Sequence, residues 1–165
     1  MREITVKLYQ FDELNEDAKD KAREWCRDDH GMKGQWAWDQ VQEDAENVGL
    51  KIMRLHDHRP NEGKFIGTAL ETLESILKEH GNNCETHKTA QRYEKSLREA
   101  IEAVNQDEPE ACDKLEDVET ELLADLLEDY RIMYNENIEY AYSDEAIDED
   151  MRANEWEFTE MGKRA

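Results

Sequence analysis

The sequence has no long apolar run and few of the features that mark membrane, exported or disulfide-linked proteins. No stretch of about 18 apolar residues occurs, so no transmembrane helix is expected. The first residues, MREITVKLYQFDEL, lack the apolar segment of a signal peptide. Cys26, Cys84 and Cys112 are odd in number and far apart, which argues against a disulfide framework and fits reduced thiols. We therefore expect a cytoplasmic protein with no membrane partner.

Sequence motifs of the common enzyme classes are also missing. No GxSxG, GxGxxG or P-loop sequence is present, and no HExxH or Glu-x-x-His pair falls on a predicted helix. The acid-rich stretch SDEAIDED lacks the Asp/Asn alternation and the central Gly of an EF-hand. With 43 acidic residues, pairs of carboxylates arise by chance and carry no information on catalysis. We expect a protein that is not an enzyme and has no cofactor.

One group of metal-ligating residue types stands out at the predicted junction of two helices. In the segment HGNNCETH, His80, Cys84 and His87 are ligands of the kind that zinc prefers. Their spacing matches no recurring Cys/His zinc pattern, and Gly81 among polar residues also fits an ordinary turn that ends a helix. We therefore assign no metal ligand, and a metal-dependent hydrolase built on this cluster is the least favoured of three hypotheses.

Hydrophobic periodicity predicts an α+β fold, with five or six helices on a small, mainly antiparallel sheet. Strands are predicted over 3–9 and 50–55, and in the segments KFIG and EWEFT. Helices are predicted over 16–31, over 38–48 after a loop at 31–34, and from Thr68, which forms a capping box with Glu71. Further helices are predicted over 86–105, from Pro109 past Tyr140, and after Ser143. Without a low-complexity linker, residues 1–165 are expected to form a single domain.

The tryptophans divide into residues with a clear core position and one residue without. Trp25 and Trp38 lie on the apolar stripes of predicted helices, so we expect them to be buried. Trp36 lies beside the predicted loop at 31–34 and is less constrained. Burial against the first helix is the favoured interpretation, and an interface anchor is the alternative, because Trp is a common hot-spot residue.

The formal charge of −22 comes from 21 basic and 43 acidic residues, and it is distributed unevenly along the chain. Residues 106–160 hold 21 acids against Lys114, Arg131 and Arg152, a balance of −18. Residues 1–105 have a balance of only −6. A field of this sign favours basic partners and opposes direct contact with nucleic acid or anionic membranes. The acidic, helical C-terminal third is therefore the main indication of function.

Within the long predicted helix, acids recur at intervals of four residues, a spacing at which like charges oppose helix formation by roughly 0.2–0.5 kcal/mol per pair. Nine acids from 110 to 129 occupy about 30 Å of helix, roughly one per 3.3 Å, close to the ~3.4 Å rise per phosphate of a DNA strand. A solvated charged surface without a partner is the alternative interpretation. We predict a partner-binding face made of Asp113, Asp117, Glu121, Asp125, Asp129, Glu110, Glu116 and Glu128.

Three segments that together span much of the chain are YQFDELNEDAKDKAREW, ETLESILKEHGNNCETHKTAQRY and ANEWEFTEMGKR. They resemble small proteins encoded by tailed bacteriophages and prophages, which are usually labelled hypothetical or antitoxin-like and supply no active site to carry over. The resemblance implies a viral protein in a host bacterial cell, where an acidic protein acts as an anti-defence inhibitor, such as an anti-CRISPR protein or a DNA mimic. The expected partner is a basic nucleic-acid-binding host protein, either a CRISPR effector or a restriction enzyme. An antitoxin-like regulator that neutralises a basic toxin is the alternative.

Overall fold

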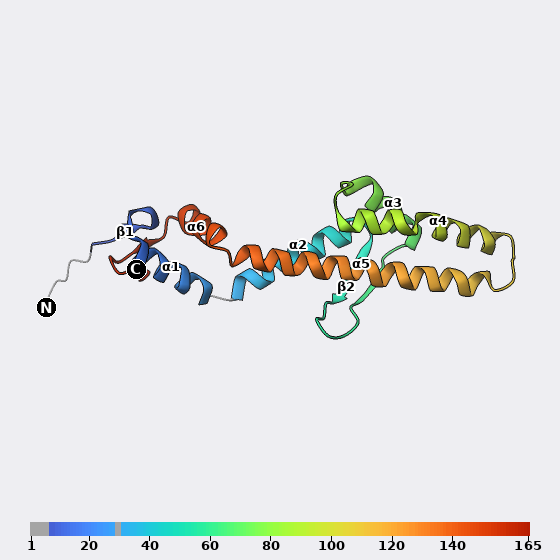
Figure 1. Cartoon of the computed structure of the whole chain (residues 1–165), viewed down its shortest axis with the longest axis horizontal. Coiled ribbons are helices and arrows are strands. Elements are labelled where there is room, and N and C mark those ends of the chain that lie inside the picture. The colour runs from blue at the N-terminus through green and yellow to red at the C-terminus, as the bar shows by residue number, and fades with distance from the viewer. Residues whose placement is uncertain (1–6, 29–30) are drawn as a thin grey trace. The chain divides into compact units, whose positions relative to one another are not determined.

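The computed structural model describes residues 7–28 and 31–165, and over these residues the α+β prediction is confirmed (Figure 1). The chain is 67% helical, with six α-helices and two antiparallel two-stranded sheets in its described part. The elements are β1 (Tyr9–Gln10), a 3-10 turn η1 (Phe11–Glu13), α1 (Glu16–Asp28), α2 (Gly31–Asn47), β2 (Leu50–Arg54), β3 (Glu62–Phe65), α3 (Ala69–Glu79), α4 (Glu85–Asn105), α5 (Ala111–Ala141), α6 (Asp144–Ala153) and β4 (Glu157–Phe158).

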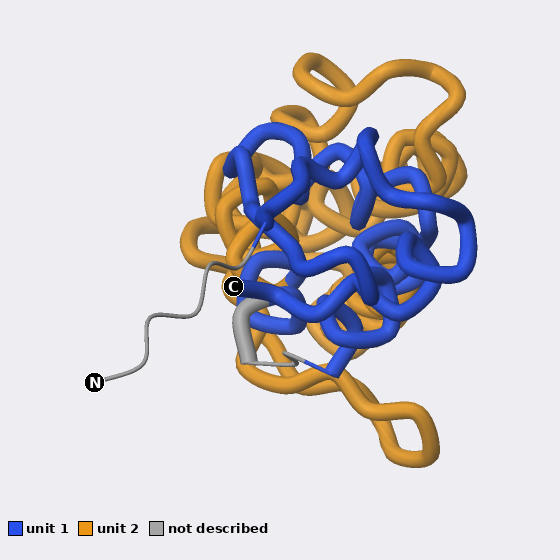
Figure 2. The backbone as a smooth tube through the Cα atoms, turned by 90° about the vertical axis from the view of Figure 1, so that its left-hand side faces the viewer, with its two compact units in different colours: residues 1–37, 136–165 blue, residues 38–135 orange. Residues whose placement is uncertain are grey.

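The described residues form two compact units, each with its own apolar core (Figure 2). Unit 1 combines the described residues up to Ala37 with Glu136–Ala165, and unit 2 is Trp38–Asn135. Both boundaries fall inside helices, α2 and α5, rather than in loops. No change of composition marks either boundary, because each lies within a continuous helix, and the single domain over residues 1–165 stays a prediction.

Unit 1 joins segments from both ends of the described chain. β1 pairs antiparallel with β4, and Phe158 of β4 is fully buried in the core of the unit. α1 contributes a small buried face that includes Ala22, which leaves room for α6 to approach. Arg23 of α1 donates two hydrogen bonds of 2.8 Å to the two carboxylate oxygens of Asp148 on α6. Both side chains are largely shielded from water, so this two-point contact fixes the position of α6 against α1.

Unit 2 packs α3, α4 and α5 with the β2–β3 hairpin and most of α2. Leu50 and Ile52 of β2 point into its core, where they join Leu73 and Ile76 of α3. Gly63 of β3 lies close to α5, because a Cβ atom at this position would come within 2.6 Å of a Leu127 methyl group. This close approach of strand and helix therefore favours glycine at position 63.

Several predicted helix boundaries are confirmed and others are wrong. The Thr68 capping box is present at the start of α3, and the Ser143 hydroxyl caps α6. The predicted loop at 31–34 is instead the first turn of α2, because glycine weakens a helix without preventing it. Pro109 precedes α5, which begins at Ala111. Most of the predicted strand at 3–9 lies outside the described residues, and β1 covers only Tyr9–Gln10.

The sequence predicted that the chain has no transmembrane helix and no disulfide framework. Across residues 7–28 and 31–165, no helix combines the length and apolar character needed to cross a membrane. The three cysteines are free: Cys26 is buried, Cys84 is half-buried and Cys112 is exposed.

Gly162 and Gly34 offer a matched test of the fold of unit 1. Gly162 has a φ of +76°, and a Cβ atom there would overlap the backbone of Ala18. Gly162→Ala should therefore lower the free energy of unfolding by more than about 2 kcal/mol. Gly34 has open space around it within α2, so Gly34→Ala should raise that free energy by roughly 0.5–1 kcal/mol. Chemical denaturation of both variants measures the two signs, and a destabilised Gly34→Ala protein would contradict the helix at 31–34.

Candidate functional site

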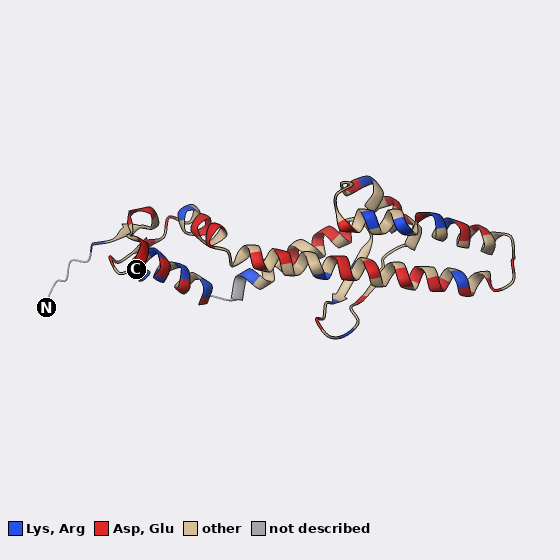
Figure 3. Cartoon of the chain, in the orientation of Figure 1, with Lys and Arg blue, Asp and Glu red and all other residues tan. Residues whose placement is uncertain are grey.

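The predicted binding face lies on α5, whose apolar and acidic residues occupy different sides of the helix. Leu122, Leu126, Leu127 and Tyr130 are fully buried or nearly so in the core of unit 2. Their positions, at i, i+4, i+5 and i+8, keep them on one side, so the acids between them must lie toward the flanks or the opposite side. Figure 3 shows Asp and Glu residues along much of the helix.

The open carboxylates gather where α4 leads into α5. We call this group the acidic tip; its members are exposed and form no ion pair with any described residue: Glu110, Asp113, Glu116, Asp117 and Glu121. Asp107 and Glu108, in the turn between the two helices, are exposed as well. Lys114 is the only basic residue between positions 106 and 130. The tip therefore concentrates negative charge that the described part of the chain does not neutralise.

The backbone of the same turn is left-handed at two acidic residues. Asp107 has a φ of 55° and Glu110 a φ of 59°, both in the left-handed region. Glycine adopts this region without strain, whereas a side chain with a Cβ costs about 1 kcal/mol there. A sequence selected only for stability would place glycine at such positions. The turn therefore keeps carboxylates at some cost in stability, as the charge row in α5 does.

Asp125 is held by residues of α4 rather than left open. Its Oδ2 atom accepts a hydrogen bond of 2.7 Å from the Tyr93 hydroxyl and one of 3.0 Å from an Arg92 guanidinium nitrogen. Partial burial, together with the bond to Asp125, raises the pKa of Tyr93 to about 12. The Arg92 charge is therefore already satisfied within the fold, and Asp125 helps to fasten α4 to α5.

Asp129 lies one turn further along α5 and is half-buried. Its Oδ2 atom is buried without a hydrogen-bond partner among the described residues. Burial raises the pKa of Asp129 above its ordinary value of 3.8, and the nearby Glu85 and Asp125 carboxylates add to the rise. Thr89 and Arg92 oppose it. Asp129 therefore faces α4, where a basic partner has little access to it.

Glu128 connects α5 to the loop between β2 and β3. It accepts hydrogen bonds of 2.6 and 2.9 Å from Arg131 and one of 3.2 Å from the Asn61 side chain. The Arg131 guanidinium is the main reason why the pKa of Glu128 is lowered. Of the eight predicted binding residues, the structure thus leaves five open at the acidic tip and engages Asp125, Asp129 and Glu128 within unit 2.

A basic surface lies on the β2–β3 hairpin, in the same unit as the acidic tip. Lys51, Arg54, Arg59 and Lys64 are exposed and form no ion pair in the described structure. Lys51 and Lys64 are direct cross-strand partners, an arrangement that is destabilising for like charges. Our sequence interpretation missed this surface, although the four basic residues fall within 14 positions of a very acidic chain.

The His80, Cys84 and His87 side chains are committed to local hydrogen bonds. His80 Nδ1 lies 2.6 Å from the Thr86 hydroxyl, which also contacts Cys84 Sγ at 3.0 Å, while His87 Nδ1 donates to the His80 carbonyl. His80 Nε2 is 3.5 Å from Asp44, which completes a Thr-His-Asp arrangement, but Thr86 is fully buried and closed to a substrate. In the part of the chain that the structure describes, no three His, Cys, Asp or Glu residues are placed to hold a metal ion.

Asp129 and Asp125 should respond to neutralisation with opposite signs. A raised pKa means that the folded protein disfavours ionised Asp129, so Asp129→Asn should stabilise the protein at neutral pH. The gain should shrink as pH falls through the folded pKa and vanish below 3.8, where both folded and unfolded states carry protonated Asp129. Asp125→Asn should instead lose roughly 0.5–1 kcal/mol at neutral pH. Urea denaturation from about pH 3 to pH 7 checks both; an Asp129→Asn protein that is destabilised at neutral pH would contradict the placement of Asp129.

Glu110 offers a test of whether the turn trades stability for charge. Glu110→Gly should raise the free energy of unfolding by roughly 0.5–1 kcal/mol, because it relieves the left-handed backbone strain. Glu108→Gly removes the same charge from the same turn without that relief and should not stabilise the protein. Thermal or chemical denaturation of the two variants separates strain from charge, since a purely electrostatic gain would be equal in both.

Comparison with known proteins found no relative of this chain. The chain matches no family model, no curated protein sequence and no solved structure. Inferences about its function therefore depend on the chemistry of its own residues.

Proposed function

We propose that the protein is a phage-encoded acidic inhibitor, which binds a basic nucleic-acid-handling protein of the host defence and competes with DNA for it. The acidic tip is the binding surface, and a CRISPR effector or a restriction enzyme is the target. The observation that carries the proposal is the group of exposed carboxylates without ion pairs at one end of α5. The contact is electrostatic and non-catalytic.

Carboxylate repulsion and backbone strain in the acidic tip both favour binding of a cationic partner. Asp113, Asp117 and Glu121 repel one another at intervals of four residues, by roughly 0.2–0.5 kcal/mol per pair. The strained turn before α5 adds about 1 kcal/mol at Glu110. Neither feature contributes to packing, and substitution by neutral residues or glycine would relieve both. A cationic partner also relieves them, because bound Lys or Arg residues replace carboxylate repulsion with attraction.

The spacing of the carboxylates in the acidic tip supports a partner whose basic surface normally holds nucleic acid. The five carboxylates of the acidic tip, the first at Glu110 and the last at Glu121, lie along about 17 Å of the chain, roughly one for every 3 to 4 Å. Phosphates follow one another at ~3.4 Å along the axis of a DNA strand. Lys and Arg side chains arranged for a phosphate backbone therefore find carboxylates at a similar density.

Competition with DNA tests the proposal directly. A fluorescent 20-base-pair duplex is bound to a guide-loaded CRISPR effector or to a restriction enzyme, and its displacement by the protein is followed by anisotropy between 50 and 300 mM NaCl. The wild-type protein should displace the duplex from at least one of these targets, less effectively as salt rises. The triple variant Asp113→Lys, Asp117→Lys, Glu121→Lys should compete at least tenfold less well and with a weaker salt dependence.

A charge-matched control distinguishes the tip from overall acidity. Glu43→Lys, Glu46→Lys, Glu136→Lys makes the same change in net charge at exposed positions outside the tip. This control should compete within about twofold of the wild type. Equal losses in the two triple variants would overturn the tip as the binding surface, and failure of the wild type against every target tested would overturn the proposed inhibitor.

A further inference from the structure

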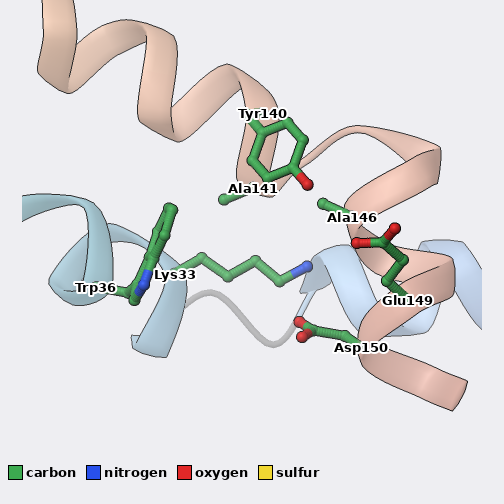
Figure 4. Close-up of a pocket in the computed structure, with 7 residues that line it drawn as sticks. All are labelled: Lys33, Trp36, Tyr140, Ala141, Ala146, Glu149 and Asp150. Atoms are coloured by element: carbon green, nitrogen blue, oxygen red, sulfur yellow. The ribbon is translucent and has the colours of Figure 1, made fainter. Parts of the chain in front are cut away.

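Unit 1 contains a cavity of about 320 Å³ that shares no residue with the acidic tip (Figure 4). Its walls come from three helices of that unit: the start of α2, the end of α5 and the middle of α6. Trp36 and Tyr140 form aromatic walls, Ala141 and Ala146 leave the space open, and charged side chains stand at the α6 side. A cavity of this size can take a single side chain or a small organic group.

The aromatic walls are unusually open to water. Trp36 is 44% exposed and Tyr140 is 50% exposed, although each is large enough to contribute strongly to a core. The favoured sequence expectation, burial of Trp36 against the first helix, therefore does not match its exposure. Exposed Trp and Tyr beside a cavity are typical of a binding hot spot, where a partner completes the burial.

Another site in unit 1 shows which group such walls accept. Trp25 and Trp156 meet edge to face, with ring centroids 5.4 Å apart. The Arg164 guanidinium lies over both rings, 4.9 Å from the centroid of Trp25 and 4.4 Å from that of Trp156. The chain thus fills one pair of aromatic rings with its own arginine, whereas the Trp36 and Tyr140 rings have no cation from the described residues over them.

The carboxylates at the α6 side of the cavity favour a positive guest. Two acids of α6 that face α1 already have arginine partners, Asp148 with Arg23 and Asp144 with Arg27. Glu149 and Asp150 line the cavity and are exposed, and neither forms an ion pair in the described part of the chain. A cation between the aromatic rings and these carboxylates would gain stacking and charge-assisted hydrogen bonds together.

Lys33 also lines the cavity, and its ammonium group has other contacts. Lys33 Nζ lies 3.6 Å from Cys26 Sγ and stands over the Tyr142 ring at 5.4 Å. Figure 4 shows the extended Lys33 stem crossing between the Trp36 wall and α6. The methylene groups of Lys33 therefore add apolar surface, while its charge partly offsets the pull of Glu149 and Asp150 on an incoming cation.

We propose that this cavity binds an arginine side chain of a protein partner. The guanidinium plane stacks against Trp36 and Tyr140, and its N–H groups donate to Glu149 and Asp150. Arginine fits better than lysine because its guanidinium is planar, weakly hydrated and able to bond two carboxylates while it stacks. The site shares no residue with the acidic tip and needs no particular target. The proposed arginine binding can therefore be tested independently of the proposed inhibitor function.

Titration with N-acetyl-arginine amide tests the site in the full-length protein. Two-dimensional ¹H–¹⁵N NMR should show saturable shifts of the Trp36 indole and of the Ala141 and Ala146 amides, with a millimolar Kd. N-acetyl-citrulline amide, which has the same shape without the charge, should bind at least tenfold more weakly. The indole signals of Trp25 and Trp156 serve as internal controls, because Arg164 already covers them.

Two substitutions should change the affinity in opposite directions. Glu149→Gln with Asp150→Asn should raise the Kd for arginine amide at least fivefold. Lys33→Met, which keeps the apolar stem and removes the competing charge, should lower it two- to threefold. Equal binding of citrulline and arginine amides, or shifts confined to the acidic tip, would overturn the proposal. So would unchanged affinity in the Glu149/Asp150 variant with an otherwise native spectrum.

Discussion

Burial of the apolar side of α5 in unit 2 is the interaction on which the acidic tip depends. Leu122 and Leu126 are completely buried, and each such side chain stabilises the fold by roughly 1.5–3 kcal/mol relative to an exposed one. Each repelling pair of carboxylates at i,i+4 opposes the helix by only about 0.2–0.5 kcal/mol. The apolar contacts therefore outweigh the repulsion several times over, and a helix that is unfavourable on electrostatic grounds stays formed.

Arginine residues divide the acids of this chain into two populations. Arg23, Arg92 and Arg131 each meet a carboxylate across or along the fold, and these pairs link α1 to α6, α4 to α5 and the β2–β3 loop to α5. These paired acids hold elements together, and the acids without an ion pair in the described structure include those of the acidic tip and those beside the cavity of unit 1. Net charge alone does not reveal this division, because each acid contributes the same −1 to the value of −22 whether or not it is paired.

Local sequence signals predicted the helices and strands well, but they predicted poorly which side chains from distant segments meet. The Thr68 capping box depends on four consecutive residues, so its geometry can be recognised without a structure. In contrast, Asp113 and Asp125 occupy equivalent positions of one periodic row, yet only Asp125 meets Arg92, 33 residues away. The expected burial of Trp36 was wrong for the same reason. Its surroundings include residues of α5 and α6, which no local pattern connects to α2. Contacts between distant segments decided which residues of each pattern remained open.

The two proposed binding sites would contribute to recognition in different ways. A group of exposed carboxylates acts over distances near the Debye length of about 10 Å at 0.1 M salt, so the acidic tip would accelerate encounter with any basic surface. Such a field selects partners by sign and is weakened by salt. A cavity with aromatic walls acts only on contact and depends on the shape of one side chain, so salt weakens its contribution less than it weakens the long-range field. A partner with both a basic surface and a projecting arginine would therefore be chosen over other basic proteins, which the charge of the chain alone does not achieve.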